Sequence, residues 1–190
     1  MSLANETEIA ELSARYGAPL RWTRTLDVSH AQAQTRVPFR NRSAEIALVI
    51  PRPNRRVLLH TKDFYPPMAY RLPTGGVHDG ERLVDAARRE IQEETGFAID
   101  LVKFLGVVEY EFIERTGRSK FASHIFLTEQ ANGAPYTADA DERISEFREV
   151  GWDELANVAD ALDQLPGDWG DWGRFRAIPH RLVAEWRLEI

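Results

Sequence analysis

The sequence predicts an α/β (α+β) fold built around a mixed β-sheet. Short β-favouring apolar runs such as Ile46–Ile50 and Val57–His60 alternate along the chain with segments that repeat apolar residues at helical spacing, the clearest of which covers residues 82–95. The chain has 190 residues, 43% of them hydrophobic, which is enough to build and cover one sizeable core. We therefore expect one main domain.

The amino-terminal part is predicted to be an extension of that domain. Residues 5–16 form an amphipathic pattern with Asn5 as a helix cap, and alternating residues at Leu20–Val28 predict a strand. The polar and basic stretch that follows is typical of a connecting segment. We expect residues 1–42 to pack on a domain that spans residues 43–190, including its last helix.

The middle of the chain predicts a hairpin, a loop and a helix in that order. Pro51 and its neighbours separate the runs Ile46–Ile50 and Val57–His60, as in a hairpin. A stretch rich in proline and glycine follows, and a helix is predicted from about Arg82 to Thr95, ended by a left-handed cap at Gly96.

Further strands and two helices complete the pattern. Gly117 suits a tight turn between two strands that would extend one mixed sheet. The expected elements are strands within residues 97–114, 120–130 and 146–152, a helix over residues 152–165 closed by Pro166, and a helix over residues 175–188.

Composition excludes several classes of function. The formal net charge is -6 and the chain has no basic stripe, so nucleic acid is not expected as a partner. Cysteine is absent, which excludes disulfides, thiolate metal sites and cysteine nucleophiles. The start lacks the pattern of a signal peptide, and no apolar run reaches membrane-spanning length. A cytoplasmic location without membrane contact is the resulting expectation.

The segment with chemical information is the helix over residues 82–95 and the loop before it. Glu90, Glu93 and Glu94 stand at positions i, i+3 and i+4, so a helix places their carboxylates on one face. Such crowding of negative charge is unfavourable unless a cation neutralises it. Oxygen ligands without cysteine favour Mg²⁺, with Mn²⁺ as a substitute, and Arg89 is expected to position a carboxylate.

This segment resembles the Nudix box, G-x5-E-x7-R-E-U-x-E-E-x-G-U, in which U is a bulky aliphatic residue. All seven fixed letters are present at the required spacing, with Phe97 at the last U position. The resemblance implies a Nudix-like α/β/α sandwich with a central mixed β-sheet, and Mg²⁺-dependent hydrolysis of a nucleoside diphosphate linked to another moiety. The matching residues are Gly75, Glu81, Arg89, Glu90, Ile91, Glu93, Glu94 and Gly96.

The resemblance also implies roles for individual residues. Glu90, Glu93 and Glu94 are the expected metal residues: Glu90 and Glu94 are the first choice as direct ligands, and Glu93 ligates a second ion, acts through water or serves as a base. Glu81 would support the loop or a further metal. The catalytic set is expected to be Glu93, Glu94, Arg89 and a carboxylate from a later loop, for which Glu142 is the first choice, Glu146 the second, and Asp139, Asp141 or Glu109 the alternatives.

The substrate stays open among nucleotide sugars, ADP-ribose, nucleoside triphosphates and dinucleoside polyphosphates. The competing hypothesis is a non-catalytic module that binds or senses a nucleotide derivative, and an isomerase or a decapping relative is a third. The expected partner is a small molecule, with a homodimer as a further expectation. Trp169 and Trp172 are read as packing for the last helix or as contacts to a second subunit.

The other aromatic and basic residues have two possible roles each, one in ligand binding and one in the structure. An aromatic set near the box either stacks on a base or packs, and an arginine set either meets a terminal phosphate or is solvated. Isolated histidines are read as structural. The three sets are Phe64, Tyr65 and Tyr70; Arg40, Arg42, Arg52, Arg55 and Arg56; and His60, His78 and His124.

Overall fold

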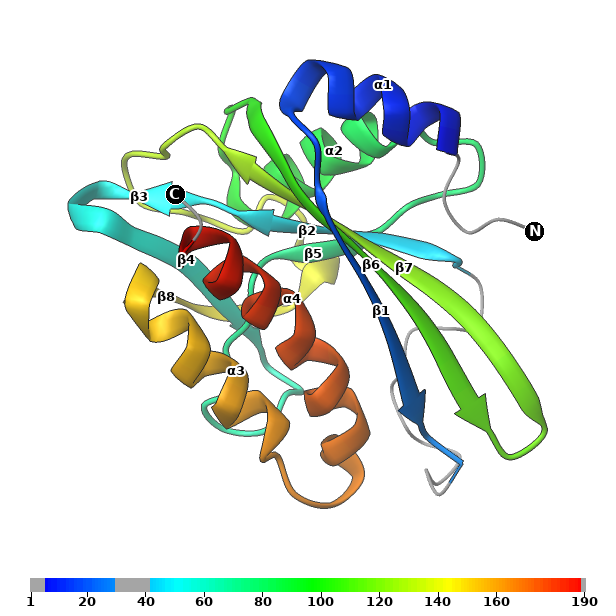
Figure 1. Ribbon diagram of the computed structural model, residues 1–190. Helices are drawn as coiled ribbons and strands as arrows, with labels where there is room; N and C mark the ends of the chain where they lie inside the picture. Colours follow the sequence, from blue (N-terminus) through cyan, green and yellow to red (C-terminus); the bar gives the residue numbers. More distant parts are fainter. Residues whose placement is uncertain (1–5, 30–41, 189–190) are drawn as a thin grey trace.

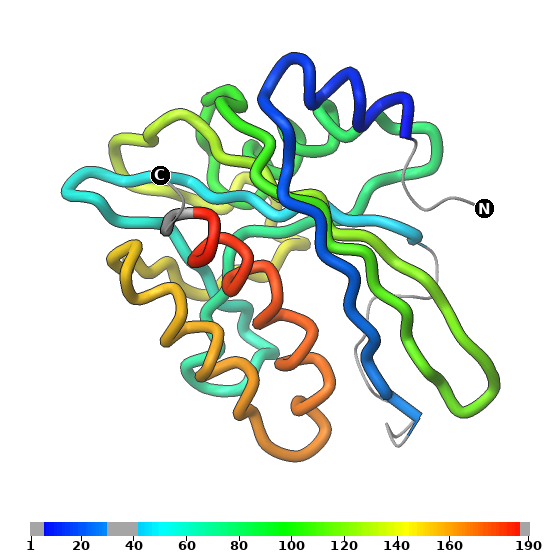
Figure 2. Tube along the Cα trace, viewed as in Figure 1, coloured from blue at the N-terminus to red at the C-terminus, as the bar shows by residue number. Residues whose placement is uncertain are grey.

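The structure is a computed structural model that describes residues 6–29 and 42–188 (Figures 1 and 2). Two β-sheets in this part of the chain lie between helices. The elements are α1 (Glu6–Tyr16), β1 (Leu20–Asp27), β2 (Ala44–Val49), β3 (Pro51–Arg52), β4 (Arg56–Lys62), β5 (Thr74–Gly76), α2 (Leu83–Thr95), β6 (Leu101–Glu114), β7 (Gly117–Thr128), β8 (Ile144–Gly151), α3 (Leu155–Asp163) and α4 (Gly170–Leu188).

The larger sheet is mixed, with the strand order β1-β6-β7-β2-β5. β6 and β7 form an antiparallel hairpin, and β1 and β2 pair in parallel with its two outer edges. The predicted hairpin is present only at its turn, where Pro51 pairs with Val57. β2, in which all six residues are buried, lies between β7 and β5 in the larger sheet. β4 instead pairs with β8 in a second, three-stranded sheet. β6 and β7 thus extend the central mixed sheet as predicted, whereas β4 and β8 belong to a second sheet that the sequence pattern did not indicate.

Two apolar clusters cover the two faces of β2, because alternate residues of a strand point in opposite directions. Ile46 and Leu48 pack with residues of α1 and α2, whereas Ala47 and Val49 belong to the cluster that contains α4. Figure 1 shows α1 and α2 on one side of the larger sheet and α3 and α4 on the other. This is the arrangement of an α/β/α sandwich with a central mixed sheet.

The helix that carries the acidic residues begins and ends where the sequence predicts. α2 runs from Leu83 to Thr95, and Gly96 follows with a φ of 67° and donates its N–H to the carbonyl of Gln92 at 2.9 Å. Only a residue that tolerates the left-handed region fits here at low cost. The predicted cap Asn5 of the first helix lies outside the described residues.

The last helix begins earlier than predicted, at Gly170 rather than Phe175. Its first turn contains two glycines, which as sequence indicate a loop. In the structure Gly173 lies against α3, and a Cβ atom there would be 2.0 Å from the carbonyl oxygen of Leu162. The glycine thus permits close helix packing, which local sequence patterns do not distinguish from a turn.

The amino-terminal elements are integrated with the rest of the molecule. β1 pairs along its whole length with β6, and α1 contributes Ile9 and Leu12 to the same apolar cluster as α2. A boundary at residue 42 stays a prediction. Among the helices of residues 6–29 and 42–188, none combines the length and apolar character needed to cross a membrane.

Candidate active site

Arg89 on α2 organises the acidic side chains of the helix and the loop before it. Its Nε and Nη2 donate to the two carboxylate oxygens of Glu81 at 2.8 and 2.9 Å, and Nη2 also donates to the carbonyl of Gly76 at 2.9 Å. Its Nη1 donates to Glu90 at 2.5 Å and to Glu93 at 3.0 Å. The hydrogen bonds from Arg89 lower the pKa of Glu81 to about 2. One guanidinium therefore holds three carboxylates in place.

Glu90 lies buried against a glycine of β5. Its side chain is 3% exposed, and burial together with the nearby charge of Glu94 raises its pKa to about 7. A Cβ atom on Gly75 would lie 1.6 Å from the carboxyl carbon of Glu90. Gly75 is required here because any side chain would occupy the position of that carboxylate.

The loop between β7 and β8 adds a third carboxylate. The N–H groups of Ala138 and Asp139 donate to the carbonyl of Glu93 at 3.0 and 3.2 Å, which ties this loop to the end of α2. A short helical turn, Ala140–Glu142, follows directly. As a result, one carboxylate oxygen each of Glu90, Glu93 and Glu142 lie within 4.8 Å of one another, a group that could hold a metal ion. We call these three residues the acidic cluster.

Glu94 lies apart from the acidic cluster, fully buried among basic side chains. Its oxygens lie 3.3 Å from Lys62 Nζ, 3.4 Å from His60 Nε2 and 4.0 Å from Arg71 Nη2. Burial opposes its charge, but these three groups outweigh burial and lower its pKa to about 2. Lys62 Nζ is also 2.5 Å from Glu142, so Lys62 connects the buried carboxylate to the acidic cluster.

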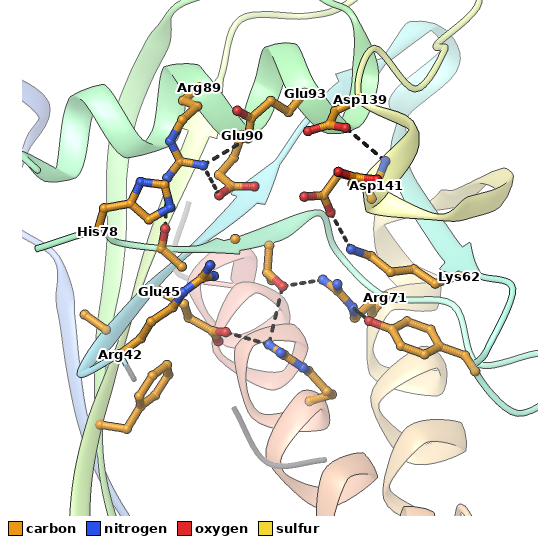
Figure 3. A pocket seen from close by; sticks show the side chains of 18 residues that line it. Arg42, Glu45, Lys62, Arg71, His78, Arg89, Glu90, Glu93, Asp139 and Asp141 are labelled. Carbon is orange, nitrogen blue, oxygen red and sulfur yellow. Dashed lines mark hydrogen bonds and ion pairs between the residues drawn. The ribbon is translucent and has the colours of Figure 1, made fainter. Parts of the chain in front are cut away.

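The acidic cluster forms one wall of a cavity of about 450 Å³ (Figure 3). Figure 3 shows Glu90, Glu93 and Asp139 on one side of this space and Arg71, Glu45 and Arg42 on the other. A volume of this size suits a nucleotide-sized ligand. The cavity thus combines a group of carboxylates with a wall that carries arginines.

The comparison with known families decides the classification. The NUDIX domain matches residues 41–172 of the chain. The chain belongs to the NUDIX family. Solved structures show the same fold: the MutT protein from Methanosarcina mazei Go1 has a TM-score of 0.56 at 18% identity and covers 78% of this chain and 95% of its own. For a NUDIX hydrolase from Nitrosomonas europaea the TM-score is 0.55 at 18% identity, with 78% and 90% covered.

Three curated relatives of this NUDIX protein have different names. An RNA pyrophosphohydrolase of Dinoroseobacter shibae is 32% identical over 104 residues, which are 50% of this chain and 65% of the relative. An oxidized purine nucleoside triphosphate hydrolase of Danio rerio is 34% identical over 76 residues, which are 40% of this chain and 46% of the relative. An ADP-ribose pyrophosphatase of Methanocaldococcus jannaschii is 28% identical over 124 residues, which are 65% of this chain and 70% of the relative. The chain thus matches less than two thirds of the length of the first two.

The alternative carboxylates of the NUDIX site fall into two groups. Asp139 and Asp141 line the cavity next to Glu142, and Asp139 accepts a hydrogen bond from the backbone of Asp141 at 2.9 Å. Glu146 is exposed on β8 and Glu109 lies on β6, and neither lines this cavity. The loop after β7 therefore brings carboxylates to the site, while the following strand does not.

The aromatic and basic candidates divide in the same way. Tyr65 and Arg42 line the cavity, whereas Tyr70 lines a separate space of about 200 Å³ beside α3. Arg52 is buried and donates to Glu149 and to two backbone carbonyls. Trp172 packs against Tyr65, with ring centroids 4.7 Å apart. Arg40 lies outside the described residues.

Four charged residues of the cavity wall were missed by sequence reasoning. They come from β2, β4, the segment before β5, and α4, so they share no motif. Glu45 carried a signal, because an acidic residue inside an apolar strand run needs a buried partner. Arg176 within the apolar stripe of the last helix carried the same signal. The four residues are Glu45, Lys62, Arg71 and Arg176.

Proposed function

We propose that this protein hydrolyses the pyrophosphate bond of a nucleoside diphosphate linked to another moiety, with Mg²⁺ as the metal. The observation that carries the proposal is the acidic cluster in a cavity of about 450 Å³, with ligand atoms within 4.8 Å of one another. Membership of the NUDIX family and the names of the curated relatives, three hydrolases of phosphate anhydrides, support it.

The residues fit a hard divalent cation. Oε2 of Glu90 is buried and accepts no hydrogen bond from any described residue, and the buried oxygens of Glu94 face Lys62, His60 and Arg71 without a well-aligned hydrogen bond. Buried oxygens with unused electron pairs are suited to Mg²⁺ or Mn²⁺. We assign Glu90 and Glu93 as ligands and Glu94 as a further carboxylate for the ion, whereas Glu142, the third member of the acidic cluster, is assigned to the reacting water. Glu94 must exchange its contact with Lys62 for one with the ion before it can bind the metal.

When bound, Mg²⁺ would neutralise phosphate charge and lower the pKa of an attacking water. Arg89 then keeps Glu90 and Glu93 oriented by its hydrogen bonds. The water oxygen forms a bond to one phosphorus, the bond from that phosphorus to the bridging oxygen breaks, and the leaving phosphate takes the electron pair. We assign Glu142 as acceptor of the water proton, because its side chain is 25% exposed and lies at the cavity.

A screen of substrates tests the proposal. The purified chain is assayed with Mg²⁺ or Mn²⁺ on ADP-ribose, a nucleotide sugar, nucleoside triphosphates, a dinucleoside polyphosphate and an RNA with a 5′-triphosphate, and released phosphate is measured after phosphatase coupling. At least one substrate is expected to be cleaved, and EDTA is expected to stop the reaction. Binding of a nucleotide derivative without turnover of any substrate would favour the non-catalytic module.

Variants locate the reaction within the molecule. Loss of a residue that only supports a metal ligand typically reduces activity roughly 10- to 100-fold. Because Glu93 is assigned as a ligand itself, Glu93→Gln is expected to reduce turnover by more than this. The matched control is Glu146→Gln, an exposed acid outside the cavity, which should keep wild-type turnover. Equal activity of the two variants would refute the site. A cytoplasmic location and a homodimer remain predictions.

A further inference from the structure

The wall of the cavity opposite the acidic cluster contains a second group of polar side chains. We call Arg71, Thr74 and Arg176 the cationic corner; all three line the same cavity. Arg71 is 2% exposed and Arg176 is 7% exposed, so neither is a solvated surface arginine. Arg176 comes from α4 and lies beyond residues 41–172, the part that the NUDIX domain matches.

The two arginines are held in place by neighbours that use only part of their donors. Arg176 Nη1 donates to Glu45 at 2.7 Å and to Thr74 Oγ1 at 3.4 Å. Arg71 donates through Nε to the hydroxyl of Tyr65 at 2.9 Å, and through Nη1 to the carbonyl of Leu72 at 2.9 Å and to Thr74 Oγ1. Because Thr74 Oγ1 accepts from both guanidinium groups, its own hydrogen remains available to donate.

The remaining donors of the two arginines make no hydrogen bond within residues 6–29 and 42–188. Nε of Arg176 is buried, and neither it nor Nη2 donates to a residue of this part of the chain. Nη2 of Arg71 lies 4.0 Å from Glu94, which is beyond hydrogen-bond distance. Buried donors without acceptors are costly, and so is the like charge of two guanidinium groups that meet at one hydroxyl. An anion with several oxygen atoms would relieve both costs.

A histidine one turn along α4 fixes the geometry of the corner. His180 Nδ1 is 2.8 Å from the carbonyl of Arg176, and His180 Nε2 accepts the N–H of Leu72 at 3.0 Å. The ring therefore joins the backbone of the Arg176 turn to the residue next to Arg71. A subsite whose side chains are fixed before the ligand arrives loses less entropy on binding.

We propose that the cationic corner binds a phosphoryl group beyond the two whose shared bond is cleaved at the acidic cluster, so that substrates with three or more phosphates in a row are preferred. This inference rests on the proposed function, because it requires the cleaved diphosphate to lie against the acidic cluster. Two guanidinium groups and a hydroxyl match a tetrahedral oxyanion. A planar base edge would instead occupy a single guanidinium group.

Binding of inorganic tripolyphosphate in EDTA tests the corner without turnover. Removal of Arg176 alone would leave the buried Glu45 without its cation, so the comparison uses Glu45→Gln and the double variant Glu45→Gln/Arg176→Gln. Both carry the same neutral residue at position 45 and differ only in the arginine. By isothermal titration calorimetry, the double variant is expected to bind at least about tenfold more weakly. Equal affinities would overturn the inference.

Arg176→Lys serves as the second variant if the double variant does not fold. The ammonium keeps the pair with Glu45 but cannot present a fork of donors. We expect at least about threefold weaker binding of tripolyphosphate and an at least about tenfold lower ratio of kcat/KM for a nucleoside triphosphate over kcat/KM for ADP-ribose, both relative to the wild-type chain. Wild-type values for both quantities would overturn the inference.

Two further outcomes separate this inference from the proposed function. If the wild-type chain cleaves neither substrate, the proposed function fails, and tripolyphosphate binding still decides whether the corner takes an anion. If Arg176→Lys changes the preference between GTP and UTP but not the preference for a triphosphate, the corner reads the base and the inference is wrong.

Discussion

The two walls of the cavity differ in what they lack. In the acidic cluster, an oxygen of Glu90 is buried and accepts no hydrogen bond from the residues that the structure describes. In the cationic corner, Nε of Arg176 is buried and donates to none of these residues. The walls do not satisfy each other, because Lys62 and Glu94 lie between them and pair together at 3.3 Å. A ligand that brings both a cation and a chain of phosphates would complete both walls at once.

The walls also differ in construction. Two residues of the acidic cluster belong to one helix, and its loop is tied to that helix by two backbone hydrogen bonds. The cationic corner joins the segment before β5 to α4 through long-range contacts such as Leu72 to His180. Damage to the first wall should therefore act locally on catalysis, while damage to the second should also change stability.

The largest effect is expected from filling the space beside Glu90. Gly75→Ala places a methyl group 1.6 Å from the present position of the Glu90 carboxyl carbon, so that carboxylate must leave the acidic cluster. We expect turnover to fall by at least about a hundredfold and the Mg²⁺ concentration for half-maximal rate to rise. Steady-state rates over a Mg²⁺ titration measure both.

Gly80→Ala is the matched control. Gly80 has a φ of 77°, so alanine there is strained, but a Cβ atom would meet nothing within 4 Å. This variant should lose about 1 kcal/mol of stability and keep its wild-type rate. If both glycine variants keep wild-type rates and Mg²⁺ dependence, the acidic cluster does not need the Glu90 carboxylate where the structure has it.

This difference in construction explains how far the sequence alone could go. The box residues lie in one helix and its loop, so spacing alone places Glu90 and Glu93 on one face. The neighbouring Glu142 was a choice among several acids, because its position depends on hydrogen bonds between Glu93 and a distant loop. Local periodicity contains no information about such contacts.

The cationic corner could not be predicted as a site, although Arg176 inside an apolar stripe indicated a buried partner. Arg71 stands in a segment rich in proline and glycine that gives no strand or helix pattern, and Arg176 stands in a helix that begins five residues before its predicted start. Their meeting depends on how α4 packs on the sheet. The larger sheet was predictable as mixed, but the pairing of β4 with β8 depends on β2 being enclosed on both edges.

The next largest effect concerns the residues between the walls. Lys62→Met keeps most of the apolar stem but removes the ammonium that lies 3.3 Å from the fully buried Glu94. We expect the free energy of unfolding to fall by about 3 kcal/mol, because the buried Glu94 would lose its nearest ammonium and keep Arg71, 4.0 Å away, as its charged partner among the described residues. In a Glu94→Gln background the same substitution should cost at least about 1 kcal/mol less. Urea unfolding of the four proteins gives this coupling.

An exposed ion pair, Arg88 with Asp100, is the control for the Lys62→Met measurement. Arg88 lies 3.0 Å from Asp100, and both side chains are about half exposed. Arg88→Met should cost less than about 1 kcal/mol, because solvent screens such pairs. If Lys62→Met costs no more than this control, or the same with and without Glu94, Lys62 does not connect the two walls energetically.

The smallest expected effect is the contribution of His180, next to the cationic corner, to the pH dependence of stability. Burial lowers the pKa of His180 to about 4, and the nearby charges of Arg71 and Arg176 act in the same direction. In the unfolded chain a histidine has a pKa near 6.5. The folded state therefore binds fewer protons between these values, so the contribution of His180 to stability is complete above about pH 6.5 and is lost as the pH falls toward 4.

His180→Gln removes this titration while leaving an amide oxygen that can accept the N–H of Leu72. Between pH 7 and 5, urea unfolding should show the wild-type chain losing more stability than the variant, by on the order of 2 kcal/mol. The other buried histidines, His60 and His124, titrate equally in both proteins and cancel in the difference.

An equal loss in both proteins would mean that His180 is not held neutral in the folded state. A positive His180 beside two guanidinium groups would then require a buried anion in the corner even without substrate, and the corner would no longer be a site with unused donors.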